Sequence, residues 1–160
     1  MTRRNWLVVL VFIVSLGCTT RPVVDRVISV PSDDPQMNAA IAKARATVDD
    51  FVSVLRAPKA SQSMFSVKIP ISDGDEREHF WLSGVRYDGS EFSGKIDNDP
   101  ETVKTVKLGQ AVSARSAEIS DWMYVDHGKL VGGYTLRVLR DRMSPSDRAE
   151  FDRSVPFKVE

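Results

Sequence analysis

The chain has 160 residues, with 22 basic and 22 acidic side chains, two histidines and one cysteine. It has no excess of basic charge, and this argues against a nucleic-acid partner. A single cysteine cannot form an internal disulfide, so the folded part must be held together by packing alone. The length is that of one domain with a core of its own.

The N-terminal segment has the pattern of a secretory signal. Arg3 and Arg4 precede an apolar run from Trp6 to Val14. The run is too short for a membrane-spanning helix, which needs about 20 apolar residues, and it is typical of the hydrophobic region of a signal peptide. We therefore predict a signal peptide over residues 1–17 and leave it out of the folded domain.

Cys18 follows this segment directly, after the small residues Ser15 and Gly17. Its position resembles the lipobox of bacterial lipoproteins, in which the thiol is acylated and becomes the mature N-terminus. The box usually has leucine where this chain has Ser15, and the small residues also suit an ordinary signal peptidase. We predict lipidation of Cys18, with palmitate among the acyl groups, and a membrane attachment through this lipid anchor. In a Gram-negative host, Thr19 in place of aspartate favours the periplasmic face of the outer membrane over the inner membrane.

Residues 18–34 are predicted to be a tether, with an edge strand over residues 27–30. The strongest helix signal follows, because Asp34 is a capping carboxylate and Pro35 suits the first helical position. Apolar residues then recur at spacings of three and four as far as Leu55, on one stripe of an amphipathic helix. Pro58 ends the helix, because the residue before a proline is pushed out of helical geometry.

The period then changes to two. Apolar residues from Phe65 to Ile71 alternate with Ser66, Lys68 and Pro70, which predicts a half-buried strand. Pro70 cannot donate to a strand ladder, so the strand should lie at an edge or end there. Two β-rich arms follow, joined by a hairpin turn at residues 88–89.

Further strands are predicted over residues 109–114 and 119–125, with a turn at residues 127–128 and a short arm at 129–131. Residues 134–143 fit a helix and a strand equally well. Ser144, Pro145 and Asp147 then begin a final helix. This order predicts a single α+β domain over residues 35–160, a curved antiparallel sheet of about five or six strands packed by the N-terminal amphipathic helix and C-terminal helices.

Several stretches resemble the bacterial family catalogued as domain of unknown function 2314. They are "EHFWL", the stretch from Gly94 to Pro100, "VKLGQ" and "DWMY" with the following glycine-rich "GGYT". The resemblance covers about residues 37–143. It implies a fold and no reaction, and family members with a lipoprotein-type leader agree with the prediction for Cys18.

The sequence assigns no catalytic residue, metal or cofactor. A zinc site needs three or four ligands, and neither His79, expected in a strand, nor His127, expected in a turn, has a second ligand at a suitable spacing. The acidic run at residues 73–79 lacks the twelve-residue calcium loop. The glycine-flanked serine of many hydrolases is also missing.

The candidate binding surface consists of aromatic and polar residues on two predicted strands: His79, Trp81, Asp121, Trp122 and Tyr124. Alternation predicts that Trp122 and Tyr124 share one face of their strand. In the other strand one face is predicted to carry His79, Trp81, Val85 and Tyr87. Two interpretations stay open: the rings fill the inside of a curled sheet, or part of the face is an open aromatic platform for a glycan strand or a protein.

The resulting expectation is an uncharacterised envelope lipoprotein whose domain binds an envelope protein or peptidoglycan without catalysis. One alternative is a small envelope hydrolase that uses His79 or His127. Another is an inhibitor or immunity-type protein that acts through a loop, at residues 73–78 or 126–129.

Overall fold

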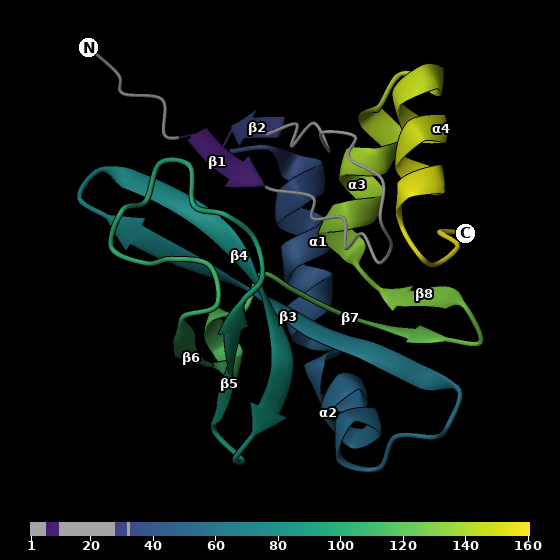
Figure 1. Cartoon of the computed structure of the whole chain (residues 1–160). Coiled ribbons are helices and arrows are strands. Elements are labelled where there is room, and N and C mark those ends of the chain that lie inside the picture. Colours follow the sequence, from purple (N-terminus) through teal and green to yellow (C-terminus); the bar gives the residue numbers. More distant parts are fainter. Residues whose placement is uncertain (1–5, 10–27, 32) are drawn as a thin grey trace.

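The computed structural model of the protein describes residues 6–9, 28–31 and 33–160. Cys18 and the predicted cleavage site lie outside these residues. The elements in chain order are β1 (Trp6–Val9), β2 (Ile28–Pro31), α1 (Pro35–Ala46), α2 (Val48–Arg56), β3 (Gln62–Asp73), β4 (Glu76–Tyr87), β5 (Glu91–Ile96), β6 (Ala111–Arg115), the 3-10 turn η1 (Ser116–Glu118), β7 (Asp121–Asp126), β8 (Lys129–Gly132), α3 (Tyr134–Arg142) and α4 (Pro145–Ser154) (Figure 1).

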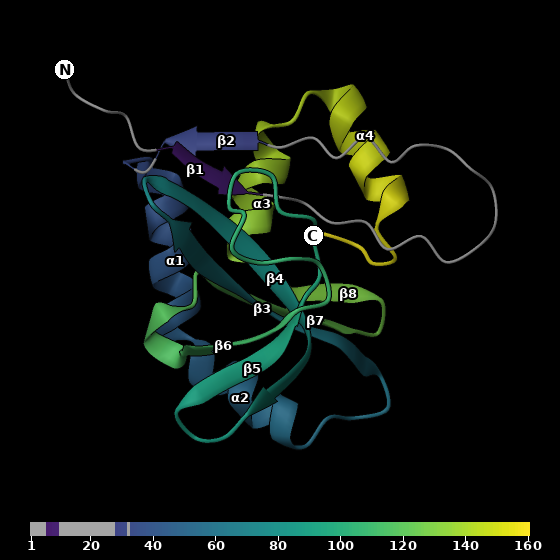
Figure 2. The same ribbon diagram turned by 60° about the vertical axis from the view of Figure 1, so that its left-hand side comes forward.

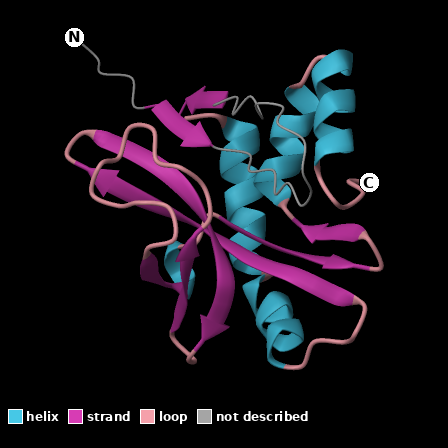
Figure 3. Cartoon of the chain, viewed as in Figure 1, coloured by secondary structure: helices cyan, strands magenta, loops and turns pink. Residues whose placement is uncertain are grey.

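The strands from β3 to β8 form an open antiparallel sheet. Strand β3 lies between β4 and β7, β8 pairs with β7, and β5 joins β4 to β6. Strand β2 pairs with β1, and β1 pairs in parallel with β4 at Glu78 and His79. Along the chain, strands β3 to β8 lie between two pairs of helices, and Figure 3 distinguishes the helices in cyan from the strands in magenta. The predicted α+β architecture is confirmed, and no helix in the described part of the chain has the length and apolarity to cross a bilayer.

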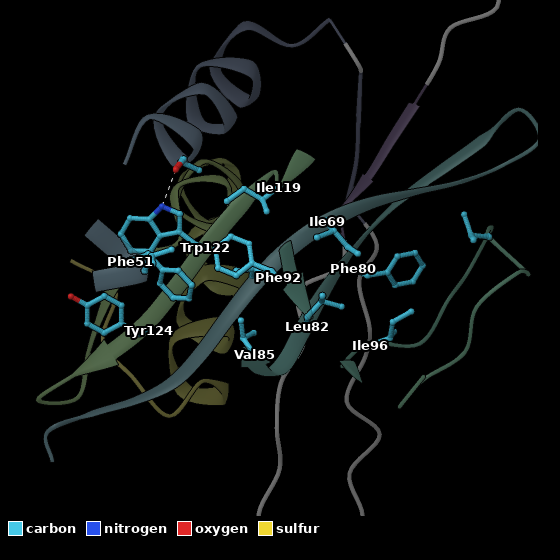
Figure 4. Close-up of a cluster of buried hydrophobic side chains, with 14 residues drawn as sticks. Phe51, Ile69, Phe80, Leu82, Val85, Phe92, Ile96, Ile119, Trp122 and Tyr124 are labelled. Carbon is cyan, nitrogen blue, oxygen red and sulfur yellow. Dashed lines mark hydrogen bonds between the residues drawn. The ribbon is translucent and has the colours of Figure 1, made fainter. Parts of the chain in front are cut away.

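Two apolar clusters hold these elements together. The main core lies between the sheet and helices α1 and α2, and the smaller cluster lies between strands β7 and β8, helices α3 and α4 and the C-terminal residues. Figure 2 shows α1 and α2 on one side of the sheet and α4 away from them. In the main core Phe51 stacks on Trp122 with ring centroids 5.3 Å apart, and the Trp122 indole donates to the Ala44 carbonyl at 2.9 Å (Figure 4).

The N-terminal helix begins as predicted but is divided in two. Asp34 accepts a hydrogen bond from the Met37 amide at 2.8 Å, with Pro35 in the first turn. Thr47 leaves helical geometry, with φ −113° and ψ 13°. Its hydroxyl donates to the Lys43 carbonyl at 2.8 Å, and such a bond competes with the backbone ladder. The Ala44 carbonyl in turn accepts the indole of Trp122, so a distant strand stabilises the break.

The alternation predicted for two strands changes in the structure. Pro70 lies inside the long strand β3, but the pairing of β3 with β7 ends at Lys68 and Asp121. The missing N–H of Pro70 therefore leaves no gap in the hydrogen bonds between β3 and β7. In β4 the register shifts between Ser83 and Arg86, where Gly84 has φ +61°. This bulge turns Val85 into the main core, so the predicted common face of Trp81 and Val85 is wrong.

The C-terminal region resolves the open choice between helix and strand. Residues 134–142 form helix α3. The final helix begins as predicted, because the Ser144 hydroxyl accepts a hydrogen bond from the Asp147 amide at 3.2 Å and Pro145 occupies the first turn.

Candidate functional site

The five residues of the candidate binding surface all lie in the interior. His79 and Asp121 are 3% and 0% exposed, and the three rings of Trp81, Trp122 and Tyr124 are 4%, 3% and 9% exposed. The structure therefore corrects the open-platform interpretation. It also separates the residues, because Trp122 and Tyr124 belong to the main core whereas Asp121 lies in a buried polar cluster, with His79 and Trp81 beside it.

The aromatic residues of "DWMY" are structural. Trp122 and Tyr124 point to the same side of β7, where their ring centroids are 6.3 Å apart (Figure 4). Tyr134 meets Trp122 edge to face at 5.5 Å, and Phe65 stacks on Tyr124 at 5.3 Å. Burial of such rings supplies the largest apolar contribution to a core without disulfides.

Asp121 is the centre of the buried polar cluster. Its carboxylate accepts hydrogen bonds from the amides of Trp122, Tyr134 and Thr135 at 2.9, 3.1 and 2.8 Å. The Thr135 hydroxyl donates a fourth bond at 2.6 Å. These bonds join β7 to the first turn of α3, where amides lack helical partners. The carboxylate therefore caps the helix from inside the protein.

The glycines before α3 allow this approach. Gly132 has φ +72°, and a Cβ atom there would lie 2.4 Å from the Trp122 carbonyl oxygen. The Gly133 amide donates to the same oxygen at 2.8 Å. The spacing of "DWMY" and "GGYT" thus reflects one packing unit.

Lys68 is the cation whose charge acts on this carboxylate. The strand pattern places Lys68 among polar residues, yet the side chain is 1% exposed because Trp81 and the start of α3 cover that face. Its ammonium donates to the Thr135 hydroxyl at 3.4 Å and lies 5.1 Å from the centroid of the Trp81 ring. The charge of Lys68 is therefore linked to Asp121 through a hydroxyl group.

Burial changes the proton affinity of both groups. It lowers the pKa of Lys68 to about 8, and the charge of Asp121 opposes this change in part. Burial raises the pKa of Asp121, and the Thr135 hydrogen bond and the Lys68 charge act in the opposite direction. Each shift favours the neutral form, as expected for charges removed from water.

His79 lies next to this cluster and contacts a serine. Its Nδ1 atom is 2.7 Å from the Ser120 hydroxyl, which donates to the Lys68 carbonyl at 3.2 Å. Because the Ser120 hydroxyl gives its hydrogen to the Lys68 carbonyl, the imidazole proton is assigned to Nδ1. Nε2 has no partner among the described residues. Burial, and then the charge of Lys68, hold the pKa of His79 well below its ordinary value. The imidazole is therefore neutral at physiological pH.

Sequence reasoning missed a second buried carboxylate, Glu78. It is 0% exposed and accepts hydrogen bonds from the amides of Glu101, Thr102 and Val103 at 3.1 to 3.3 Å. Nearby, the Asn98 side chain accepts from the Trp81 amide at 2.9 Å. The sequence holds a signal for this contact. "EHFWL" supplies a carboxylate in a strand, and "DNDPETV" is a turn whose backbone amides need acceptors. A hydrogen-bonded contact between the two could have been predicted.

His127 has a different environment. Its side chain is exposed, and Nδ1 lies 2.7 Å from the Asp126 carboxylate. Hydrogen bonds from Ser61 and Gln62 lower the pKa of Asp126. In this group the carboxylate lies between the serine and the histidine, whereas a hydrolytic triad needs the histidine in the middle. Within the described residues no three histidine, cysteine, aspartate or glutamate side chains are grouped to hold a metal.

One accessible concave surface is a groove of about 590 Å³, here called the β3–β6 groove. It is lined by residues 69–72 of β3 and 112–114 of β6, with residues of η1. Arg45 of α1, Arg77 of β4 and Val106 complete its lining. Both arginines are exposed. Of the two loops of the inhibitor hypothesis, residues 73–78 contribute Arg77 to this lining and residues 126–129 contribute no side chain to it.

Comparisons with known proteins relate the chain to other bacterial proteins. The chain is 40% identical over 112 residues to the uncharacterised protein YegJ of Escherichia coli K12, covering 70% of this chain and 72% of that protein. It is 31% identical over 131 residues to a putative ankyrin repeat protein of Neisseria meningitidis serogroup B, and this match covers 77% of the chain and 52% of the longer protein. No solved structure gives a significant match. The model of the family described as an uncharacterised protein conserved in bacteria, domain of unknown function 2314, matches residues 34–158, and the chain belongs to this family.

Proposed function

We propose that the protein is an envelope lipoprotein whose folded domain binds a partner without catalysing a reaction. The observation that carries the binding role is the separation of buried from accessible groups. Lys68, His79 and Asp121 are at most 3% exposed and serve packing, whereas the β3–β6 groove is open and carries exposed cations. A concave surface with a few placed polar groups is the usual form of a binding site.

The membrane address is supported by the sequence pattern around Cys18. Cys18→Ala should abolish labelling by radioactive palmitate and move the protein from the membrane to the soluble fraction after cell fractionation. Ser15→Ala is the matched control, because it changes a small residue of the same box and keeps the thiol. Membrane retention of Cys18→Ala with normal yield would contradict lipid anchoring.

The binding role is tested by capture from envelope extracts. The purified protein, immobilised through its C-terminus, should retain a partner that survives washing. Substitution of exposed groove residues should abolish retention, and substitution of Arg153 on α4 should not. Retention of no protein and no peptidoglycan fragment would contradict a binding function.

The hydrolase alternative has one supporting contact, the 2.7 Å approach of Ser120 to His79. It predicts cleavage of cell-wall fragments by the wild-type protein, and loss of this cleavage in Ser120→Ala with the fold retained. The binding proposal predicts no turnover by either protein.

A further inference from the structure

One edge of the β3–β6 groove is an unpaired part of β3. The ladder between β3 and β7 ends at Lys68, while β3 continues to Asp73, where β4 is its sole paired neighbour among the described strands. The Lys68 carbonyl accepts from the Ser120 amide at 2.7 Å, so it faces the β7 side. Backbone groups alternate along a strand, so the carbonyl of Pro70 and the amide and carbonyl of Ser72 face the groove.

The opposite edge of the groove is the outer side of β6. The Gln110 carbonyl accepts from the amide of Ile96, the last residue of β5, and the Ser116 amide donates to the carbonyl of Ser90, just before β5. The backbone groups of Val112 and Ala114 therefore face β5 as well. Alternation turns Ala111 and Ser113 outward. In the described part of the chain β5 is the sole strand paired with β6. At the far end, the Glu118 carboxylate accepts the Arg115 amide at 3.1 Å and closes the edge there.

The floor and the charge of the groove restrict what can lie in it. Ile69 is buried, and Ile71 and Val112 pack on the main core, so the floor is apolar. Arg45 donates its Nε hydrogen to the Ile119 carbonyl at 2.8 Å, which fixes its guanidinium beside the groove. Arg77 forms no ion pair with any described residue. The charge of Glu118 is compensated by its ion pair with Arg115.

We propose that the β3–β6 groove binds an extended polypeptide segment that alternates acidic and apolar residues, as an added strand. Unpaired strand edges recognise an extended backbone, and pockets for alternate side chains give specificity. The two arginines select carboxylates over ammonium groups. A glycan is disfavoured because the described residues that line the groove include no aromatic side chain. This inference deepens the binding role proposed above and rests on it.

Synthetic peptides as long as β6, which has 5 residues, test the proposal directly. The probe is a capped peptide of alternating valine and glutamate, and the matched control replaces glutamate by lysine. With the full chain, the acidic peptide should bind in calorimetry and shift amide resonances of β3 and β6. The lysine peptide should bind at least about tenfold more weakly. An acidic peptide with N-methylated alternate amides should not bind.

Two variants separate backbone from charge recognition. Ser113→Pro removes an outward amide hydrogen and no backbone bond to β5, and edge strands tolerate proline. It also removes the exposed hydrogen bond from the Ser113 hydroxyl to the Glu91 carboxylate. Arg77→Glu reverses a charge beside the groove, and Arg153→Glu is the control on α4. We expect about tenfold weaker binding for Arg77→Glu, loss of binding for Ser113→Pro, and no change for Arg153→Glu. Unfolding curves establish whether each variant is folded. If Ser113→Pro does not fold, Arg77→Glu alone decides the test.

The proposal is overturned if the acidic peptide does not bind, if it binds Arg77→Glu as well as the wild type, or if peptidoglycan fragments occupy the groove instead. Capture of an envelope partner by both groove variants, with no peptide binding, would reject the groove and keep the binding function. Failure of peptide binding together with failure of capture would reject both.

Discussion

The buried ammonium of Lys68 should make the stability of the protein depend on pH in the alkaline range. Lys68→Met keeps the unbranched side chain and removes the ammonium that titrates. The pKa of Lys68 is about 8 in the folded protein and 10.5 for an ordinary lysine. Between these values the unfolded chain holds one proton more than the folded protein. The free energy of unfolding therefore rises with pH in this window.

The size of the effect follows from the difference between the two pKa values. The full cost of burying the charge is about 3 kcal/mol and is present below pH 8. About 2 kcal/mol of it should be recovered between about pH 7.5 and pH 10 in the wild type, because the folded protein has lost the proton by then. Lys68→Met should lack this gain. Lys59→Met, at an exposed position, should keep it.

Urea unfolding followed by tryptophan fluorescence measures the effect, since Trp81 and Trp122 are both buried. The quantity of interest is the stability of the wild type minus that of Lys68→Met at each pH. We expect this difference to increase by about 2 kcal/mol over the window. Parallel curves for the two proteins would refute the reasoning, because they would mean that the folded state does not disturb the titration of Lys68.

Two further predictions concern backbone contacts. Gly132→Ala should destabilise the protein by about 3 kcal/mol or more, because the new Cβ meets the Trp122 carbonyl. The control Gly128→Ala, with φ +75° and open space around the new Cβ, should cost about 1 kcal/mol. Equal urea midpoints for the two variants would contradict the crowding argument. Glu78→Gln should cost about 2 kcal/mol and speed hydrogen exchange of the Thr102 amide, because an amide group turns a donor toward the donors of the loop. The control Glu76→Gln, at an exposed position, should leave both measurements unchanged. The same null result for Glu78→Gln would mean that the Glu78 carboxylate does not hold the loop.

Local signals predicted those parts of the fold that depend on neighbours in sequence. The cap at Asp34 and the turn at residues 127–128 lie where the sequence places them, since each depends on a few adjacent residues. The break at Thr47 was not predictable, because it is stabilised by Trp122, 75 positions further along the chain. The bulge at Gly84 reverses an alternation that is regular in the sequence.

The polar interior was less predictable than the apolar one. Lys68 and Glu78 lie in stretches that alternate or carry charge, and such patterns usually indicate a solvated face. Their burial depends on partners from α3 and from residues 101–103, which no local period can reveal. Asp121 belongs to the predicted binding surface, but the structure buries it, and its part in the fold is to cap α3.

The attachment of residues 98–103 has a consequence for molecular recognition. Glu78 and Asn98 fix this stretch to β4 at two points, and Val103 is inserted fully into the main core. The long connection from β5 to β6 is thus as firmly seated as a regular element, and β6 is already in place before any partner arrives. A bound peptide would therefore meet a preformed strand edge, and only the peptide would lose conformational freedom on binding. Its association should proceed in a single kinetic phase, with no slow rearrangement of the protein.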